Sequence, residues 1–375
     1  MILHITNDYS GSTVYKNLIR ELDTLGIEQI IYNPIRDAGR NGKNKIDLSV
    51  SHSQIIYSNI LSKYTDRIFY QKKIKKIVCD IESKVDLTKV TFIHAHTWYS
   101  DGGAAYELHK KYNIPYIVAV RNTDLNLFWK YFFHKRNYGR KIFLNASKII
   151  TISAVYKNRI FEDERLSSII DKIKDKVEII PNGVDPYWIQ NKVSARKQIT
   201  DKDIIQLLYI GKFDKGKNIV NLIKAVKNIN QNKNSPKLRL TLIGAKGNDE
   251  KRTLDLIKND VYFNYLGRID DLRELKKHFQ QSDIFTMPSK AETFGLVYVE
   301  ALLQGLPVLY TKNEGIDGFY NDSIGEKVEN TSVEEIQNKI EKLILNYYQY
   351  NFNIVELSQN HDWKKIAEIY RQLYN

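Results

Sequence analysis

The sequence predicts an α/β protein made of two doubly wound, Rossmann-like domains, each built on a parallel sheet. Three observations support this fold class. The chain has 375 residues, which exceeds the length at which one core usually divides into two. Apolar strand patterns alternate with helical patterns, as is typical of parallel sheets flanked by helices. The alternation breaks once, after Pro181-Asn-Gly-Val-Asp-Pro186, and then restarts.

This break sets the expected domain boundaries. Residues 1–186 form the N-terminal domain and residues 187–358 the C-terminal domain. Residues 359–375 form a last helix that crosses back onto the N-terminal domain. The stretch Tyr187–Lys202 is polar and irregular, and we place the linker between the domains there. Two such domains are expected to face each other across a cleft, with ligands at the carboxyl ends of the strands.

The N-terminal half opens with a strand, a loop and a helix. Met1–Thr6 is apolar, Asn7–Ser12 is rich in turn residues, and Ser12 or Thr13 can cap the helix that follows. Gly11 is the one glycine of this loop, so it is a weak phosphate-loop signal and a candidate for donor binding. Further strands are expected at 29–32, 55–57, 90–94, 116–120, 148–152 and 177–180, and further helices at 69–85 and 103–112.

The C-terminal half repeats the alternation. Strands are expected at 204–210, 238–243, 262–266, 284–287 and 308–311. Helices are expected at 218–229, 249–258, 272–281, 296–304, 333–346 and 363–374.

Charge and composition limit the classes of partner and compartment. Lys and Arg number 57 against 44 Asp and Glu, so the net charge of +13 favours phosphorylated substrates, anionic membranes or nucleic acid. Cys79 is the one cysteine, which excludes an internal disulfide, and its neighbours Ile74, Ile77 and Ile81 predict inert packing. No run reaches the length of a membrane span and no signal peptide opens the chain, so a cytoplasmic location is expected.

The stretch Pro288–Val308 carries the strongest chemical signal. Glu292 lies in a loop after an expected strand, and Glu300 lies in the helix that opens near Gly295. The backbone N–H groups of Phe294, Gly295 and Leu296 stand at the positive end of that helix, which suits an anion. Ionised carboxylates accept hydrogen bonds from hydroxyl groups. A phosphate between two hydroxyl-bearing groups describes a nucleotide-sugar.

A second signal lies where the C-terminal half begins. In Tyr209–Asn218 a strand ends at Gly211, and Lys212 and Lys217 flank a tight loop before a helix. Two ammonium groups beside a helix start can neutralise a diphosphate. Two solvated lysines in a lysine-rich chain are the alternative.

Together these segments resemble the retaining glycosyltransferases of family 4, which have the GT-B fold. The family's Glu-x7-Glu motif is matched by Glu292 to Ala301, and its Gly-Arg-x4-Lys motif by Gly211, Lys212 and Lys217. Its Ile-Pro-Asn-Gly-Val-Asp motif is matched by Ile180–Asp185. The resemblance extends over essentially the whole chain.

The resemblance implies roles for these residues. Glu292 would hold hydroxyls of the donor sugar, and Glu300 the two hydroxyls of the nucleotide ribose. Phe294, Gly295 and Leu296 would hold sugar and phosphate through their amides. Lys212 and Lys217 would neutralise the diphosphate as the glycosidic bond breaks, which is catalytic if the interaction strengthens in the transition state. Arg268, after the strand 262–266, would flank the nucleotide base. Asn313–Gly318 would lie near the diphosphate or sugar.

Two departures from the family pattern stand out. Lys212 replaces the usual Arg and lacks its planar fork. Arg121-Asn-Thr-Asp124 replaces the family's His-Gly-x-Asp, so Arg121 is expected in the cleft where the family has a histidine. A structural salt bridge between Arg121 and Asp124 is the alternative.

No metal or other cofactor is expected. His94 and His96 lie two apart at a strand end and so face the same side, but the sequence supplies no third ligand at zinc-like spacing. We interpret them as polar residues near the acceptor pocket. Asp201-Lys-Asp203 matches a metal-binding Asp-x-Asp pattern but lies at the end of the expected linker, away from any donor site.

The expected function is therefore transfer of a sugar from a nucleotide diphosphate, UDP by family habit, to a hydroxyl acceptor, with retention of configuration. Surface polysaccharide or glycolipid synthesis is the expected setting, with a sugar or lipid-linked sugar as acceptor. Aromatic and basic residues interleave in Phe128–Lys141, and Lys72, Lys73, Lys75 and Lys76 form a basic helix face, so peripheral contact with an anionic membrane is a further hypothesis. A sugar-nucleotide epimerase is the alternative enzyme, and a nucleic-acid-binding protein, for which no motif is present, the alternative class.

Overall fold

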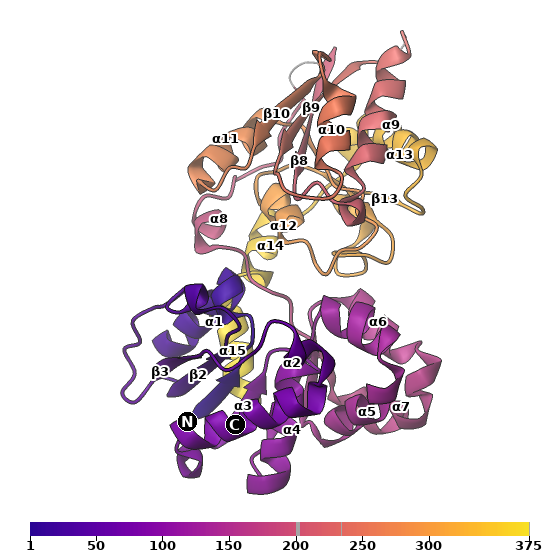
Figure 1. Ribbon diagram of the computed structural model, residues 1–375. Coiled ribbons are helices and arrows are strands. Elements are labelled where there is room, and N and C mark those ends of the chain that lie inside the picture. The colour runs from indigo at the N-terminus through magenta and orange to yellow at the C-terminus, as the bar shows by residue number, and fades with distance from the viewer. Residues whose placement is uncertain (200–202, 234, 375) are drawn as a thin grey trace. The chain divides into compact units, whose positions relative to one another are not determined.

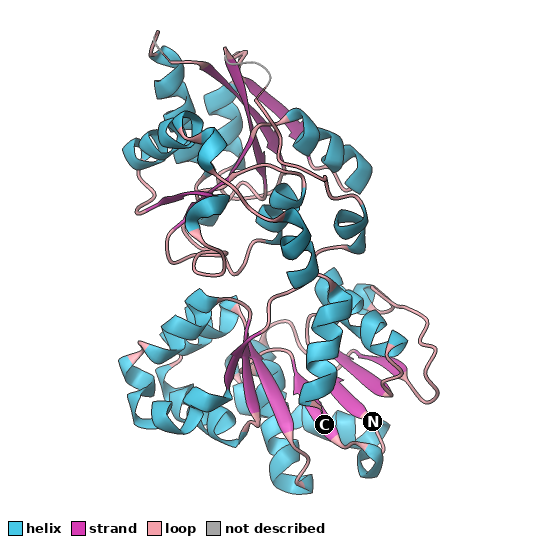
Figure 2. Ribbon diagram, turned by 180° about the vertical axis from the view of Figure 1, so that it is seen from behind, coloured by secondary structure: helices cyan, strands magenta, loops and turns pink. Residues whose placement is uncertain are grey.

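The computed structural model describes residues 1–199, 203–233 and 235–374, and it divides the chain into two compact units. The first unit comprises Met1–Ile152, Tyr156–Gly183 and Trp363–Asn375, and the second Ser153–Val155 and Val184–Asp362. Each unit contains one parallel sheet with helices against it (Figures 1 and 2).

The first unit holds a seven-stranded sheet in the order β3-β2-β1-β4-β5-β6-β7. Its central strands are buried along their whole length and rich in Ile and Val, as is typical of parallel sheets covered on both faces. The strands are β1 (Ile2–Ile5), β2 (Gln29–Pro34), β3 (Gln54–Ser58), β4 (Phe92–Ala95), β5 (Tyr116–Val120), β6 (Lys148–Thr151) and β7 (Val177–Ile179).

Helices connect these strands. Ser12 caps the first of them, as expected, because its hydroxyl accepts from the backbone N–H of Val14 at 3.3 Å. The helices are α1 (Thr13–Thr24), α2 (Thr65–Ile68), α3 (Tyr70–Lys84), α4 (Ser100–Tyr112), α5 (Arg136–Asn145), α6 (Ala154–Phe161) and α7 (Ser167–Ile173), with a π-helix at Asp124–Trp129.

The C-terminal helix α15 (Trp363–Leu373) belongs to the first unit and packs beside α1 (Figure 1). Trp363, Ile366 and Tyr370 of this helix are buried in the same apolar cluster as Leu18 and Leu22 of α1. The end of the chain therefore completes the core in which its beginning lies.

The second unit holds a six-stranded sheet in the order β10-β9-β8-β11-β12-β13. Its strands are β8 (Ile204–Ile210), β9 (Lys237–Ile243), β10 (Phe263–Gly267), β11 (Ile284–Thr286), β12 (Val308–Thr311) and β13 (Gly325–Val328). Its helices are α8 (Pro186–Gln190), α9 (Ile219–Gln231), α10 (Glu250–Ile257), α11 (Leu272–Gln281), α12 (Leu296–Leu303), α13 (Val333–Leu345) and α14 (Ile354–Asn360).

Both sheets share the doubly wound order in which the chain reverses direction beside its first strand. The reversal falls between β1 and β4 in the first unit and between β8 and β11 in the second. Ligands of such folds bind outside the carboxyl ends of the strands at this point. The loops after β1, β4, β8 and β11 are therefore the places to examine for a site.

The stretch predicted as a linker is part of the second unit. The unit boundary falls between Gly183 and Val184, and Trp188 on α8 is completely buried. Beyond α8, Val193 and Lys197 donate backbone hydrogen bonds to the carbonyls of Leu303 and Gly305. Polar sequence was misread as a free linker because its backbone partners come from a distant segment. Thr200, Asp201 and Lys202 lie outside the described residues.

Two expectations on helix α3 were wrong. Cys79 is exposed rather than packed, since about 100° of rotation per residue places it opposite Ile77 and Ile81. Lys73 is buried rather than on a basic face, and its ammonium donates to the hydroxyl of Ser100 at 2.5 Å. Strand β13 and helices α2, α5, α6, α7, α8 and α14 were not predicted. Within the described residues, no helix has the length and apolar character needed to cross a bilayer.

Candidate active site

The strongest candidate site lies in the second unit, where β8 and β11 end side by side. The loop after β8 turns through a short 3₁₀ helix at Lys215–Lys217, and Asp214 caps it by accepting from the N–H of Lys217 at 3.1 Å. The loop after β11 is bonded to this turn, because the N–H of Lys290 donates to the carbonyl of Gly216 at 2.8 Å. Neighbouring strands thus bring together two motifs that are far apart in the sequence.

The ammonium of Lys217 forms an ion pair with the carboxylate of Glu292. Both side chains are largely shielded, with 22% of the lysine and 12% of the glutamate side chain exposed. Because this ion pair is only weakly hydrated, charged or polar groups of a substrate can replace one of its members as the partner of the other. We call the pair the polar centre. Lys212 precedes Lys217 in the same loop and is exposed, and the hydroxyl of Tyr209 donates to its backbone carbonyl at 2.7 Å.

Glycines let the loops of this edge approach closely. A Cβ on Gly244, after β9, would lie 1.8 Å from the carbonyl oxygen of Gly211, and its φ of +145° also excludes most side chains. Gly211 is held by its N–H, which donates to the carbonyl of Ile243 at 3.0 Å. The backbone at Gly211 is therefore a fixed part of the loop that carries Lys212 and Lys217.

The helix α12 starts at the same edge without a side-chain cap. Gly295 precedes it with φ of +78°, and no side chain accepts from the first N–H groups of the helix. Phe294 is buried, and its ring packs edge-to-face on Phe319 with centroids 5.4 Å apart. A Cβ on Gly295 would lie 3.1 Å from Cγ of Glu292, so this helix start is close to that side chain. Among the described residues no side chain caps it, which leaves its N–H groups available to an anion.

The loop Asn313–Gly318 supplies a carboxylate that the sequence did not single out. The backbone N–H of Glu292 donates to Oε2 of Glu314 at 2.8 Å, and the N–H of Gly315 donates to the carbonyl of Glu292 at 3.2 Å. This loop follows β12, which pairs with β11. Resemblance to the family placed this loop near the donor, but Glu314 as a partner of Glu292 was not expected.

Glu300 lies on α12, near Asp185 and Trp188. Burial, and to a smaller extent the charge of Asp185, raise the pKa of its carboxyl to about 7, against the opposing effect of a hydrogen bond with Trp188. Asp185 also caps α8 by accepting from the N–H of Tyr187 at 2.9 Å. Asp185 and Glu300, which come from two of the motifs noted in the sequence, therefore lie close together in the second unit. The part of Asp185 and Trp188 in tuning Glu300 could not be seen from spacing alone.

Arg121 follows β5 in the first unit. Its guanidinium donates to the backbone carbonyl of His96 and to the amide oxygen of Asn182, each at 3.3 Å. The carboxylate of Asp124 instead accepts from the backbone N–H groups of Trp98, Tyr99 and Arg121, at 3.0, 3.0 and 2.9 Å. Asp124 thus organises the backbone, and the arginine side chain is held by neutral oxygens.

Two candidates are not joined to the charged centre by any described contact. Arg268 follows the outer strand β10 and forms an exposed ion pair with Asp270 at 2.8 Å. Gly11 ends a 3₁₀ helix, where a Cβ would lie 2.1 Å from the carboxylate of Asp8. Gly11 belongs to the first unit, so its role in donor binding stays a prediction.

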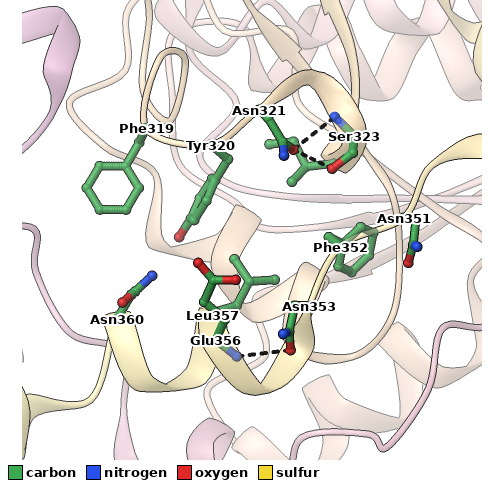
Figure 3. Close-up of a pocket in the computed structure, with 11 residues that line it drawn as sticks. Phe319, Tyr320, Asn321, Ser323, Asn351, Phe352, Asn353, Glu356, Leu357 and Asn360 are labelled. Carbon is green, nitrogen blue, oxygen red and sulfur yellow. Dashed lines mark hydrogen bonds between the residues drawn. The ribbon is translucent and has the colours of Figure 1, made fainter.

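A separate pocket of about 560 Å³ lies in the second unit between Phe319–Ile324 and helix α14 (Figure 3). Asn321 and Asn353 line it, but both amide oxygens already accept from neighbouring backbone N–H groups. Glu356 is the one charged residue of its lining, which contains no lysine or arginine. The pocket therefore lacks the cations that a diphosphate requires.

Comparison with known proteins identifies the class to which this chain belongs. Residues 11–188 match the model of the family described as Glycosyltransferase Family 4, and residues 190–368 match Glycosyl transferases group 1. The chain belongs to glycosyltransferase family 4.

Individual relatives agree with this assignment. An uncharacterized glycosyltransferase of Methanocaldococcus jannaschii is 26% identical over 97% of this chain and 94% of its own. The alpha-monoglucosyldiacylglycerol synthase of Acholeplasma laidlawii is 25% identical over 82% of this chain and 77% of its own.

Solved structures identify the fold as GT-B. Sucrose-phosphate synthase from Thermosynechococcus elongatus superimposes with a TM-score of 0.72 at 19% identity, over 100% of this chain and 98% of its own. The lipopolysaccharide outer core galactosyltransferase WaaB gives 0.72 at 14% identity, over 100% and 99%. The expected fold class, two Rossmann-like parallel-sheet domains of the GT-B type, is confirmed.

Proposed function

We propose that this glycosyltransferase moves a sugar from a nucleotide diphosphate donor, of which UDP is the first to test, to a hydroxyl group, with retention of configuration and without a metal ion in the reaction. The observation that carries the donor assignment is the Lys217–Glu292 pair beside the uncapped start of α12. A cation, a carboxylate and free N–H groups within one loop pair match the groups of a sugar diphosphate.

The donor would occupy the edge where β8 and β11 end. Lys212 and Lys217 would neutralise the diphosphate. Both lie in the loop after the carboxyl end of β8, whose backbone is fixed at Gly211. The N–H groups of Phe294, Gly295 and Leu296 would bind phosphate and sugar oxygens. Glu292 would then leave Lys217 to accept hydroxyls of the sugar, and Glu300 would accept the two hydroxyls of the ribose. Arg268 would flank the base.

The reaction exchanges one glycosidic bond for another. The bond between the anomeric carbon and the diphosphate oxygen breaks, the acceptor oxygen bonds to the same carbon, and the acceptor proton passes to the departing phosphate. Charge therefore develops on the diphosphate, where the lysines lie, so their interaction strengthens in the transition state. A catalytic role for Arg121, which belongs to the first unit, is also proposed. The family assignment supports retention.

The acceptor is proposed to be a lipid-linked sugar or a glycolipid, reached at an anionic membrane. Ile68 and Phe133 are 70% and 73% exposed, and Tyr64, Phe69 and Tyr131 are also more than half exposed. The segments 64–70 and 128–135 lie close together, since the ring of Tyr70 contacts that of Phe128 and the ammonium of Lys135 lies over the ring of Tyr70. We call Tyr64, Ile68, Phe69, Tyr131 and Phe133 the aromatic surface.

Lysines border this aromatic surface, as an interfacial segment requires. Lys72 lies over the ring of Phe69 and Lys130 over that of Tyr131, at 5.0 and 5.4 Å from the ring centroids. Apolar side chains with flanking ammonium groups suit the headgroup region of anionic lipids. A relative that makes a glucosylated diacylglycerol, by its name, supports the same class of acceptor.

The test is a nucleotide-sugar panel followed by transfer. Thermal denaturation with UDP-, GDP-, ADP- and dTDP-sugars should identify one base that raises Tm, because ligand binding stabilises the native state. The donor so found should lose its sugar only when an acceptor hydroxyl is added, with the product anomer equal to the donor anomer by NMR. Isomerisation of the donor without an acceptor would instead support the epimerase alternative. Full transfer by Glu292→Gln would refute the site.

A further inference from the structure

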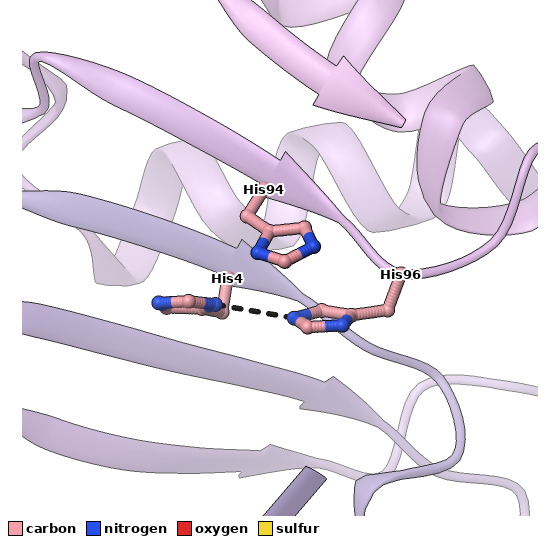
Figure 4. A group of neighbouring side chains, drawn as sticks. All are labelled: His4, His94 and His96. Atoms are coloured by element: carbon pink, nitrogen blue, oxygen red, sulfur yellow. Dashed lines mark hydrogen bonds between the residues drawn. The ribbon is translucent and has the colours of Figure 1, made fainter. Parts of the chain in front are cut away.

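Three histidines of the first unit converge inside the protein (Figure 4). His4 lies on β1, His94 on the neighbouring β4, and His96 directly after β4. All three are buried, so they do not line a pocket as expected from the sequence. His94 and His96 do face the same side, as predicted, with rings stacked at 3.9 Å. The missing third partner is His4, which the pairing of β1 with β4 brings alongside.

The separations suit a shared ion. One ring nitrogen of each histidine lies within 4.8 Å of those of the other two. Nδ1 of His4 and Nε2 of His96 are 3.1 Å apart, in a single hydrogen bond. Two imidazoles on one tetrahedral zinc, with Zn–N distances of about 2.0–2.1 Å, have nitrogens about 3.3–3.4 Å apart. The closest pair therefore already has about the spacing of two zinc ligands.

The cluster is incompletely bonded. Nε2 of His94 is fully buried, and it has no hydrogen-bond partner among the residues that the structure describes. A buried polar atom without a partner is unfavourable, and a metal ion would satisfy it.

The surroundings resemble the outer shell of a metal site. Nδ1 of His94 is hydrogen-bonded to the hydroxyl of Tyr374 at 2.7 Å, which leaves Nε2 of that ring for an ion. Metal-bound histidines usually use their second nitrogen in this way. The ring of Tyr370, on α15, packs against His94 with centroids 4.8 Å apart. The C-terminal helix thus covers the cluster.

We propose that His4, His94 and His96 bind one transition-metal ion of the class that prefers imidazole, with Zn²⁺ as its representative. The ion would join β1 to β4 and, through Tyr374, to the end of the chain, so its role is structural. It is independent of the donor site, since all of its ligands and Tyr374 belong to the first unit. A structural ion in the first unit is therefore compatible with a sugar transfer that uses no metal ion.

One nearby charge opposes the ion and supplies a directional test. Nε of Arg121 donates to the backbone carbonyl of His96 at 3.3 Å, so the guanidinium places a positive charge beside the cluster. Arg121→Gln should therefore tighten Zn²⁺ binding, whereas loss of a ligand should weaken it at least 100-fold. Tyr374→Phe should weaken it about 10- to 100-fold, as is typical of outer-shell partners.

The experiment uses the full chain after removal of metal with a chelator. Competition titration with Zn²⁺ should give one tight site per chain, and Co²⁺ should give the strong visible absorption bands of a tetrahedral nitrogen site. His96→Gln and His94→Gln should abolish both signals with an unchanged far-ultraviolet circular dichroism spectrum. The double variant His52→Gln/His134→Gln removes two exposed histidines and should retain both.

The outcomes decide the proposal in either direction. One equivalent of Zn²⁺ that raises Tm in the parent and the surface control, but not in the cluster variants, supports it. Absence of a Co²⁺ spectrum in the parent protein overturns it even if the cluster variants fail to fold. Equal Zn²⁺ binding by parent and variants, which is weak surface binding only, also overturns it.

Discussion

Lys217 and Glu292 form an ion pair although they stand 75 positions apart in the sequence. The contact exists because β8 and β11 are neighbours and their following loops are hydrogen-bonded to each other. In the protein without substrate the carboxylate and the ammonium neutralise each other. A sugar diphosphate would give each of them a new partner, namely the diphosphate for the ammonium and the sugar hydroxyls for the carboxylate.

Removal of either partner should therefore damage transfer without unfolding the protein. Glu292→Gln and Lys217→Met should each lower kcat about 10²- to 10³-fold, as is typical when a group that stabilises developing charge is lost. The loss of kcat in the double variant should be smaller than the product of the losses in the two single variants, because the two residues act together. Steady-state kinetics check this, with Lys215→Met, an exposed lysine of the same turn, as the control.

Donor binding should weaken as the pH falls below about 7. Glu300 must be ionised to accept two ribose hydroxyls, and burial raises the pKa of its carboxyl from 4.5 to about 7. The ionised fraction falls about tenfold per pH unit below that pKa. Calorimetric titration with the nucleoside, which lacks titrating phosphates, should show Kd rising from pH 7 to pH 5.5. Glu300→Gln should bind more weakly at pH 8, with this slope removed.

The same carboxyl should make stability depend on pH. Its folded pKa is raised, so the native state binds more protons than the unfolded state between about 4.5 and 7. Its contribution to the free energy of unfolding therefore falls as the pH rises through that window. Glu300→Gln should raise Tm at pH 8 and change it little at pH 4.5. An equal shift at both pH values would contradict the raised pKa.

Arg121 should affect catalysis more than stability. Its guanidinium is bonded to neutral oxygens of His96 and Asn182 and stays charged, so it can attract a phosphate or a sugar oxygen. Arg121→Gln should lower kcat about 10- to 100-fold with a Tm change of less than about 3 °C. A large fall in Tm with unchanged kcat would show a structural role. Arg121→His introduces the family's residue and should retain part of the activity.

Gly295→Ala should weaken donor binding and destabilise the fold. The residue has φ of +78°, and an added Cβ would lie 2.6 Å from ring atoms of Tyr298. Gly42→Ala is the matched control, since Gly42 has φ of +72° and no atom within 4 Å of an added Cβ. Both variants carry the backbone strain, which costs about 1 kcal/mol or more. Urea unfolding and donor titration should show a larger loss of stability and of donor affinity in Gly295→Ala than in Gly42→Ala. The difference is due to the contact of the added Cβ with Tyr298.

The aromatic surface should bind anionic vesicles. Ile68→Ser/Phe133→Ser removes two of its most exposed apolar side chains and should reduce flotation with vesicles containing phosphatidylglycerol by about tenfold at 0.1 M salt. Val261→Ser/Leu345→Ser removes side chains that are 81% and 84% exposed in the second unit, and should leave flotation unchanged. Equal flotation of all three proteins would contradict membrane contact by this surface.

Much of the fold follows from local pattern. Strand β5 is a continuous apolar run, β8 is an apolar run interrupted by Gln206, and the residue ranges of both were predicted correctly. Strand β13 was missed because Gly325-Glu-Lys-Val has no apolar run. Its Glu326 is buried through salt bridges to Lys339 and Lys342, at 3.3 and 2.8 Å, that only the folded unit supplies.

The residues of the candidate site could likewise be predicted only in part. Lys217 and Glu292 each stand after an apolar strand, and spacing, charge and resemblance to the family together selected them as candidates. Glu314, Asp185 and His4 were missed, because their importance comes from which strands and segments lie side by side. Strand order is a property of the whole sheet, and no single segment of the sequence encodes it.

The placement of helix α15 has a consequence for dissection of the enzyme. Because Trp363–Asn375 belongs to the unit formed by the start of the chain, residues 184–362 are a domain inserted into another domain. A fragment that stops at residue 183 lacks the helix that covers Leu18 and Leu22, and should expose that apolar face. Donor specificity should therefore be transplanted between family members by exchanging an internal segment, with both termini retained from the same parent.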